Sequence, residues 1–143
     1  MNKRRIDERA KRLIDEYDIR TPGPDILTSN LSGGNQQKVV IAKEFDRDPD
    51  ILLVVQPTRG LDIGAKEYVH EELLNQRENG KSILLISTDL EEVLALSDRL
   101  AVMFKGQIVG VVNPAETEVE KIGLMMAGIA NTGGDSTKIA ETV

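Results

Sequence analysis

The stretch that decides the fold reads Ile51-Leu52-Leu53-Val54-Val55-Gln56-Pro57-Thr58-Arg59-Gly60-Leu61-Asp62. Its first five residues are apolar without alternation, which predicts a strand buried on both faces of a parallel sheet. The polar and helix-breaking residues that follow predict a loop. A helical pattern over residues 65–74 and a second apolar run over residues 82–87 come next. Strand, helix, strand and helix in succession predict an α/β sheet with right-handed crossovers.

Upstream of this stretch lies Leu31-Ser32-Gly33-Gly34-Asn35, directly before a predicted helix over residues 36–45. Two glycines at a helix start let backbone N–H groups approach an anion closely, and the helix dipole favours negative charge there. Ser32 would add a hydroxyl donor. The same residue types are more often an ordinary helix cap, so these residues alone leave both interpretations open. An earlier helix, with an apolar stripe from Ile6 to Tyr17, is predicted to end before residues 21–24.

Three further elements are predicted downstream. Thr88 and Glu91 form a capping-box pattern at the start of a short helix. Residues 99–104 and 107–112 flank Lys105-Gly106 and predict an antiparallel hairpin at the margin of the same sheet. A last helix is predicted over residues 118–127, followed by a frayed tail.

The composition of the 143 residues excludes several classes of function. A formal net charge of −6 argues against a domain-wide nucleic-acid or membrane-binding surface. Cysteine is absent, which removes disulfides, thiolate metal sites and cysteine nucleophiles. No apolar run approaches the about 20 residues of a membrane-spanning helix. His70, beside Glu71 and Glu72, lacks the second histidine of a zinc motif and is interpreted as part of a solvated helix face.

Two motifs in this order resemble the ATP-binding-cassette (ABC) family. They are Leu31-Ser32-Gly33-Gly34-Asn35-Gln36-Gln37-Lys38 and, directly after a strand, Pro57-Thr58-Arg59-Gly60-Leu61-Asp62. By this resemblance residues 31–35 are the signature motif, 51–56 the Walker B strand, 59–62 the D-loop and 87–89 the switch loop. The Asn-Gln-Gln continuation and Gln56 look most like the second cassette of importers for simple sugars and nucleosides, which carry two cassettes in one polypeptide.

The resemblance implies an α/β fold: a partial P-loop NTPase-like core with a mostly parallel sheet, flanking helices and a C-terminal hairpin, plus part of a helical subdomain. Residues 1–47 are expected to belong to the helical subdomain, 48–128 to the C-terminal part of the ATPase core, and 129–143 to a flexible tail. No G-x-x-x-x-G-K-[ST] Walker A sequence occurs in the chain. We therefore expect the C-terminal part of a longer ATPase subunit, inactive when isolated.

Three positions depart from the pattern of an active cassette. The resemblance places the magnesium-associated Walker B aspartate at Val55, the catalytic glutamate at Gln56 and the switch histidine at Thr88. Val55 offers a cation no side-chain oxygen and is interpreted as a packed core residue. The amide of Gln56 can orient a water molecule but cannot accept its proton, and Thr88 cannot titrate near neutral pH. Gln56 and Thr88 are left open between structural polar residues and residual ligand contacts.

In this family two cassettes dimerise head to tail, and each ATP lies between one cassette's Walker A loop and the other's signature motif. The nucleotide contacts expected in trans are Ser32, Gly33, Gly34, Asn35, Gln36 and Gln37. The expected D-loop residues are Gly60, Leu61 and Asp62, with Asp62 linking the two sites. ATP and Mg²⁺ are expected only in the assembled transporter, and no metal site is expected in this chain itself.

The implied partners are the first cassette of the same polypeptide, the transmembrane permease subunits and, indirectly, an extracytoplasmic solute-binding protein. The implied location is the cytoplasmic face of the plasma membrane, as a peripheral subunit, and no nucleic-acid partner is expected. A sheet without its upstream strands is also expected to expose edges and apolar surface that favour self-association. Two alternatives stay open: a non-catalytic interaction or regulatory module derived from a cassette, and a soluble ABC protein not tied to transport.

Overall fold

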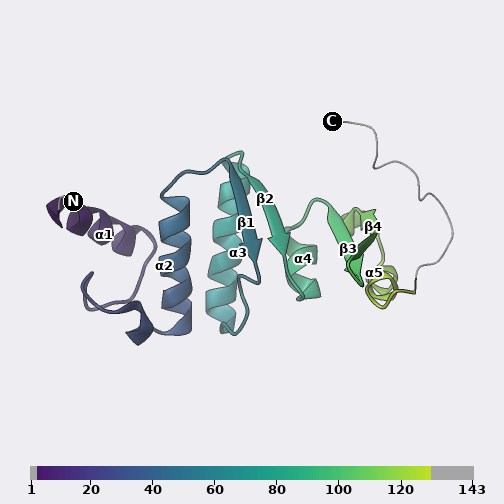
Figure 1. Ribbon diagram of the computed structural model, residues 1–143, viewed down its shortest axis with the longest axis horizontal. Coiled ribbons are helices and arrows are strands. Elements are labelled where there is room, and N and C mark those ends of the chain that lie inside the picture. Colours follow the sequence, from purple (N-terminus) through teal and green to yellow (C-terminus); the bar gives the residue numbers. More distant parts are fainter. Residues whose placement is uncertain (1–2, 130–143) are drawn as a thin grey trace. The chain divides into compact units, whose positions relative to one another are not determined.

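The computed structural model describes residues 3–129 of the chain (Figure 1). Contacts divide the chain into two compact units, with the division between Leu96 and Ser97. We call them unit 1, up to Leu96, and unit 2, from Ser97, and describe each by itself. All the residues that the sequence singled out as a candidate site lie in unit 1.

Unit 1 has the predicted order of helices and strands. It contains α1 (Lys3–Glu16), a 3₁₀ turn (Thr28–Asn30), α2 (Gly33–Phe45), β1 (Ile51–Val55), α3 (Ile63–Glu78), β2 (Ser82–Ile86) and α4 (Leu90–Leu96). The helix expected from residue 36 begins at Gly33, so both glycines of the predicted signature motif lie inside the helix. The predicted elements of this unit are therefore confirmed, apart from shifts of a few residues at their ends.

The two strands of unit 1 pair in parallel, with Ile51 opposite Ser82 and Val55 opposite Ile86. The residue after β1, Gln56, continues this pairing because its N–H donates to the Ile86 carbonyl at 2.8 Å. The loops that follow β1 and β2 therefore start at the same edge of the sheet.

The core of unit 1 lies on one face of this sheet. Its buried residues come from α2, β1, α3 and the segment after α1, and they are Tyr17, Ile19, Ile41, Ala42, Phe45, Leu52, Val69 and Leu73. Residues on both sides of the expected boundary after residue 47 share this cluster, and the division into residues 1–47 and 48–128 stays a prediction. The expected tail over residues 129–143 lies, from residue 130 on, outside the described residues.

The opposite face of the sheet is exposed, so the prediction that both strands are buried on both faces is wrong. The side chains on this face are between 48% and 73% exposed, and they are Ile51, Leu53, Val55, Leu84 and Ile86. Val55 itself is 56% exposed and is not a core residue. Successive side chains of a strand point to opposite faces, and the described residues bury only the face that carries Leu52. The unbroken apolar runs therefore give the sheet a second apolar face, which the described residues leave uncovered.

The start of α4 is capped by a different residue than predicted. Asp89 Oδ1 accepts from the N–H of Glu91 at 3.1 Å and from the N–H of Glu92 at 3.4 Å. The predicted capping box of Thr88 and Glu91 is therefore wrong. Because α4 begins at Leu90, the carboxylate directly before it takes the capping role, a role for which Asp is well suited.

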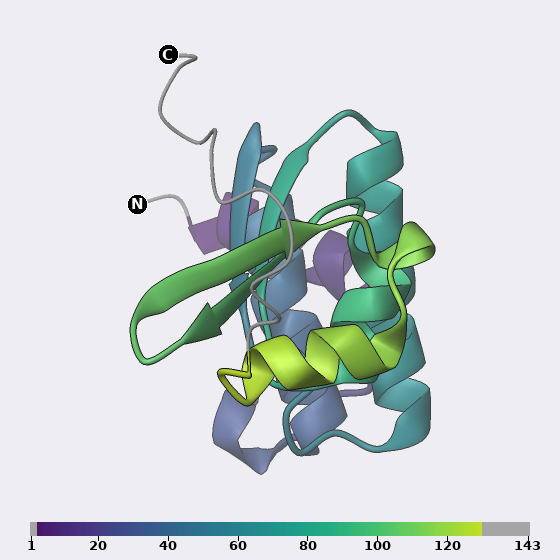
Figure 2. The same ribbon diagram turned by 90° about the vertical axis from the view of Figure 1, so that its right-hand side faces the viewer.

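Unit 2 is a hairpin with a helix packed against it (Figure 2). It contains β3 (Leu100–Phe104), β4 (Gln107–Val112), a 3₁₀ turn (Pro114–Glu116) and α5 (Val119–Met126). Lys105 and Gly106 have φ values of 47° and 79°, as a type I′ hairpin turn requires. The hairpin and the last helix are confirmed. In the described residues the hairpin strands pair only with each other, and the expectation that they lie at the margin of the parallel sheet stays a prediction.

Candidate functional site

The candidate anion-binding segment lies at the N-terminus of α2. Ser32 is the N-cap of this helix, and its Oγ accepts from the Asn35 N–H at 3.4 Å and from Asn35 Nδ2 at 2.9 Å. Ser32 and Gly33 are exposed. The first N–H groups of a helix have no acceptor within the helix, and the helix dipole adds positive potential. Capping by Ser32 therefore leaves a hydroxyl and backbone donors accessible to an anion.

Two polar side chains hold the shape of this segment. Asn35 Oδ1 accepts from the Arg20 N–H at 2.8 Å, which ties the start of α2 to the chain after α1. Gln36 Nε2 donates to the Leu31 carbonyl at 2.8 Å. These two predicted nucleotide contacts thus have structural bonds of their own, which the sequence pattern did not predict.

The predicted D-loop is a tight turn before α3. Leu61 donates its N–H to the Thr58 carbonyl at 3.1 Å, and Thr58 is only 3% exposed. Gly60 has a φ of 76°, a conformation that glycine adopts at little cost. Asp62 is the N-cap of α3, and its Oδ1 accepts from the Ala65 N–H at 2.9 Å. The turn is thus anchored on a buried threonine and ends in an exposed, capping carboxylate.

The N-termini of α2 and α3 meet within unit 1. A Cβ atom on Gly34 would lie 3.0 Å from the Ala65 Cβ, and one on Gly33 would lie 3.9 Å from Leu61 Cδ2. Gln37, in the next turn of α2, is half-buried. The predicted signature and D-loop segments are therefore direct neighbours, which sequence reasoning did not anticipate because the two motifs are far apart in the chain.

Two of the three departing positions are hydrogen-bonded to each other. The Thr88 hydroxyl donates to Gln56 Oε1 at 3.3 Å. Thr88 is exposed and Gln56 is half-buried, and both lie at the edge where β1 and β2 end. Gln56 has a φ of 50°, in the left-handed region that residues other than glycine seldom adopt. The third position, Val55, precedes Gln56 and turns its aliphatic side chain to the exposed face of the sheet.

Asp89 is the charged residue of the predicted switch loop. Its Oδ2 lies 3.3 Å from Lys66 Nζ of α3, and its N–H donates to Ser87 Oγ at 3.0 Å. The pKa of Asp89 is lowered, first by the backbone hydrogen bond from Glu92 and then by the hydrogen bond from Lys66. The carboxylate is therefore ionised at neutral pH and acts as a hydrogen-bond acceptor that ties the switch loop to α3.

His70 is half-buried rather than fully solvated, which refines the interpretation from the sequence. Its Nε2 lies 3.2 Å from Glu92 Oε1, and Glu92 is 2% exposed. The second carboxylate oxygen of Glu92 is buried without a hydrogen-bond partner. Because the two residues come from different helices, α3 and α4, no local sequence pattern could have indicated the pair.

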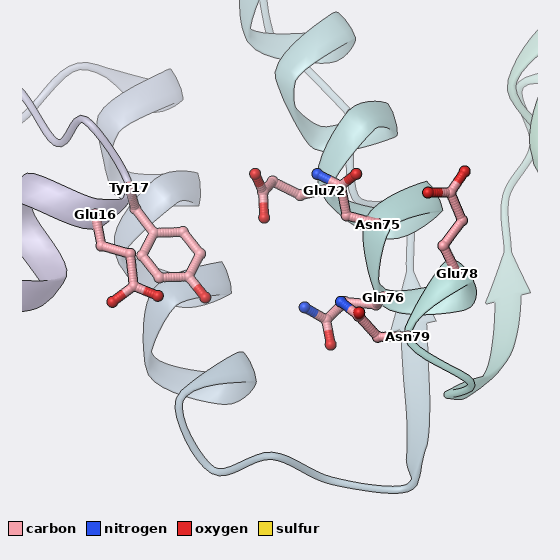
Figure 3. A pocket seen from close by; sticks show the side chains of 7 residues that line it. All are labelled: Glu16, Tyr17, Glu72, Asn75, Gln76, Glu78 and Asn79. Carbon is pink, nitrogen blue, oxygen red and sulfur yellow. The ribbon is translucent and has the colours of Figure 1, made fainter.

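A hollow of about 360 Å³ lies apart from these segments, beside the end of α1 and the second half of α3 (Figure 3). Carboxylates and amides dominate its lining, which consists of Glu16, Tyr17, Glu72, Asn75, Gln76, Glu78 and Asn79. Burial raises the pKa of Glu72, and the neighbouring Glu71 and Glu16 raise it further. No predicted site residue lines this hollow.

At the start of α2 the candidate site offers hydrogen-bond donors, and its carboxylates, Asp62 and Asp89, both serve as helix caps. Within residues 3–129, no group of three or more histidine or acidic side chains could hold a metal ion. No helix in the same range is long and apolar enough to cross a membrane. The start of α2 suits a bound anion, whereas the amide of Gln56 and the hydroxyl of Thr88 can contact a ligand without accepting a proton from water.

Curated proteins with similar sequences are import ATP-binding proteins, although no family model matches the chain. The chain is 52% identical over 128 residues to the guanosine import ATP-binding protein NupO of Bacillus subtilis, covering 90% of the chain and 25% of that protein. It is 50% identical over 124 residues to the nucleoside import ATP-binding protein NupA of Lactococcus lactis (87% and 24%). It is 45% identical over 118 residues to the ribose import ATP-binding protein RbsA of Clostridium perfringens (82% and 24%). The chain thus spans about a quarter of the length of these curated relatives.

Solved structures with the same fold are ATP-binding cassettes. A dimeric cassette in a post-hydrolysis state bound to ADP and Pi matches with a TM-score of 0.67 at 23% identity, over 80% of this chain and 49% of that one. A nucleotide-free cassette from an ABC transporter matches with a TM-score of 0.64 at 27% identity, over 74% and 42%. The chain therefore has the α/β, P-loop NTPase-like fold of an ABC ATPase, over about half of a cassette. Its sequence places it among the ABC ATPases, and the relatives that it matches are named as nucleoside and sugar import ATP-binding proteins.

Proposed function

We propose that this chain is the C-terminal part of the second cassette of an importer ATPase for nucleosides or simple sugars, and that it supplies the signature motif to the partner cassette's ATP site. One observation carries the proposal. Ser32 and Gly33 are exposed at the N-terminus of α2, and Asn35 holds the Ser32 side chain there. The solute class follows the names of the relatives.

The donor set at the start of α2 fits the phosphates of ATP. Phosphate oxygens are anionic acceptors, whereas Ser32 and the first backbone N–H groups of α2 are donors that the helix dipole reinforces. Bound ATP would supply the phosphoryl bond whose hydrolysis drives transport. In this scheme Ser32 and Gly33 bind and orient the phosphates, Gly34, Asn35 and Gln36 keep the segment in place, and Gln37 is a further nucleotide contact.

The end of β1 does not fit a hydrolytic site. Val55 offers Mg²⁺ no oxygen ligand, so any magnesium ion would have to be held by groups outside this chain. Gln56 can neither accept a proton nor act as a base, and its carbonyl oxygen is already bonded to Thr88. These features support a division of labour in which this chain completes the partner's ATP site while its own Walker B and switch residues are degenerate.

The partners follow from the same proposal. Gly60, Leu61 and Asp62 would contact the first cassette of the same polypeptide, since they lie beside the signature segment. The permease subunits and, through them, an extracytoplasmic solute-binding protein complete the transporter. The chain would then act as a peripheral subunit at the cytoplasmic face of the plasma membrane.

Thermal unfolding of the chain separates this function from a non-catalytic interaction module. The proposed function predicts that the midpoint rises when Mg-ATP and the first cassette are added together, because a ligand that binds only the native complex stabilises it. Neither addition alone should produce this rise. An interaction module predicts a shift with the first cassette that Mg-ATP does not increase.

The matched variants are Ser32→Ala and Ser82→Ala, two exposed serines of which only the first belongs to the signature segment. Ser32→Ala should remove the ATP-dependent part of the shift, and Ser82→Ala should keep it. An ATP-dependent shift that survives Ser32→Ala would contradict the proposed function.

A further inference from the structure

Ala65 links the two segments that the proposed function brings together. Its N–H donates to Asp62 Oδ1 at 2.9 Å, at the start of α3. Its methyl group faces Gly34 of α2, where an added Cβ would lie only 3.0 Å away. Carbon atoms in contact prefer separations of about 3.5–4.0 Å. A side chain at position 34 therefore cannot keep the present approach of α2 to α3.

The backbone gives no other reason for glycine at position 34. Gly34 lies inside α2, and it is not among the glycines with positive φ, which in the described residues are Gly60, Gly80, Gly106 and Gly128. Glycine in a helix is less favourable than alanine, so its presence here needs an explanation. The methyl group of Ala65 supplies one, because it is fixed to the backbone and cannot rotate away.

Gly33 provides a contrast within the same motif. A Cβ there would lie 3.9 Å from Leu61 Cδ2, which is an ordinary contact, and Gly33 is exposed whereas Gly34 is half-buried. The two neighbouring glycines therefore have different tasks: Gly33 faces solvent, and Gly34 faces α3.

We propose that Ala65 is a positioning residue, and that its contact with Gly34 sets the distance between the Ser32 end of α2 and the Asp62 end of α3. Packed helices transmit strain because interiors have low compressibility. A displacement of the D-loop would then be passed directly to the signature segment, and the two would move as one body. This inference rests on the proposed function only for its effect on ATP hydrolysis.

A size-exchange cycle tests the contact in the chain itself. The variants are Gly34→Ala, Ala65→Gly and the double variant, with Gly33→Ala as the matched control. Gly33→Ala should hold or raise the midpoint of thermal unfolding, because alanine favours the helix. The unfolding midpoint of Gly34→Ala should be about 3 °C or more below that of the control. At position 34 the clash with Ala65 opposes the gain in helix stability that alanine brings. The unfolding midpoint of the double variant should be higher than the sum of the two single midpoint shifts predicts. Midpoint shifts that simply add would contradict the proposed contact.

ATP hydrolysis by the assembled transporter tests the positioning role. Gly34→Ala should lower the rate, and adding Ala65→Gly should restore it because the space is returned. A double variant that regains its thermal midpoint but not its hydrolysis rate would overturn the role of Ala65, since Gly34 would then serve the ligand directly. Failure of the proposed function is recognised separately: Ser32→Ala would leave hydrolysis unchanged, and the size-exchange cycle would still report on the contact.

Discussion

At the scale of single residues, Gln56 combines backbone strain with a position in the candidate site. Its φ of 50° carries a cost of about 1–2 kcal/mol for a residue with a side chain. Two hydrogen bonds hold it there, one from its N–H to the Ile86 carbonyl and one from the Thr88 hydroxyl to its Oε1. Strained residues that the surrounding structure holds in place cluster at functional sites.

Replacing Gln56 by glycine is expected to stabilise the chain. Gln56→Gly should raise the free energy of unfolding in urea by up to about 1 kcal/mol, because glycine relieves the strain and the exposed bond from Thr88 contributes little. The control is Glu67→Gly, an exposed position inside α3, which should lower the same free energy by about 1 kcal/mol. If both variants lowered the free energy of unfolding equally, the left-handed conformation of Gln56 would carry no cost.

The residue types of the candidate site could be predicted from the sequence, but their partners could not. Ser32 was expected as a cap or an anion donor, and it is the cap of α2. The bond between Gln56 and Thr88 depends on the alignment of two strand ends, and the pair of His70 with Glu92 depends on two separate helices. Such contacts arise from tertiary packing, so the spacing of residue types along the chain does not predict them.

At the scale of elements, the turn-forming residues made the helices and strands predictable. Asn79 and Gly80 follow α3, and Lys105-Gly106 forms the hairpin turn, as their preferences indicate. The coverage of the sheet was not predictable. An unbroken apolar run such as β1 reports that both faces are suited to burial, whereas actual burial depends on which elements are present to cover them.

The uncovered face of β1 and β2 is expected to drive self-association of the isolated chain. Contiguous apolar patches of several hundred Å² are rare on monomers, and this one carries Leu53 and Leu84 at 66% and 59% exposure. Leu53→Lys should increase the monomer fraction measured by size exclusion with light scattering. Gln107→Lys, which adds the same charge at an exposed position of β4, should not. A wild-type chain that stays monomeric at high concentration would contradict this prediction.

At the scale of the whole molecule, the chain spans about a quarter of its curated relatives and about half of the solved cassettes. The order of the two motifs was sufficient to indicate the family, because the predicted signature and D-loop sequences fix both residue types and spacing. Residues 3–129 hold donors for an anion at the start of α2 but no metal cluster. The donors at the start of α2 support the proposed function, in which the chain completes a site whose other half lies on a partner.

ATP hydrolysis by the assembled transporter, compared between Ser32→Ala and Gln56→Glu, tests the central claim most directly. Loss of the Ser32 hydroxyl should slow hydrolysis about 10²- to 10³-fold, as expected when a donor to developing phosphate charge is removed. Restoring a carboxylate with Gln56→Glu should change the rate little, because Val55 and Thr88 stay unsuited to hydrolysis. A transporter that tolerates Ser32→Ala, but gains a large increase in rate from Gln56→Glu, would show that this chain serves its own catalytic site and would contradict the proposed division of labour.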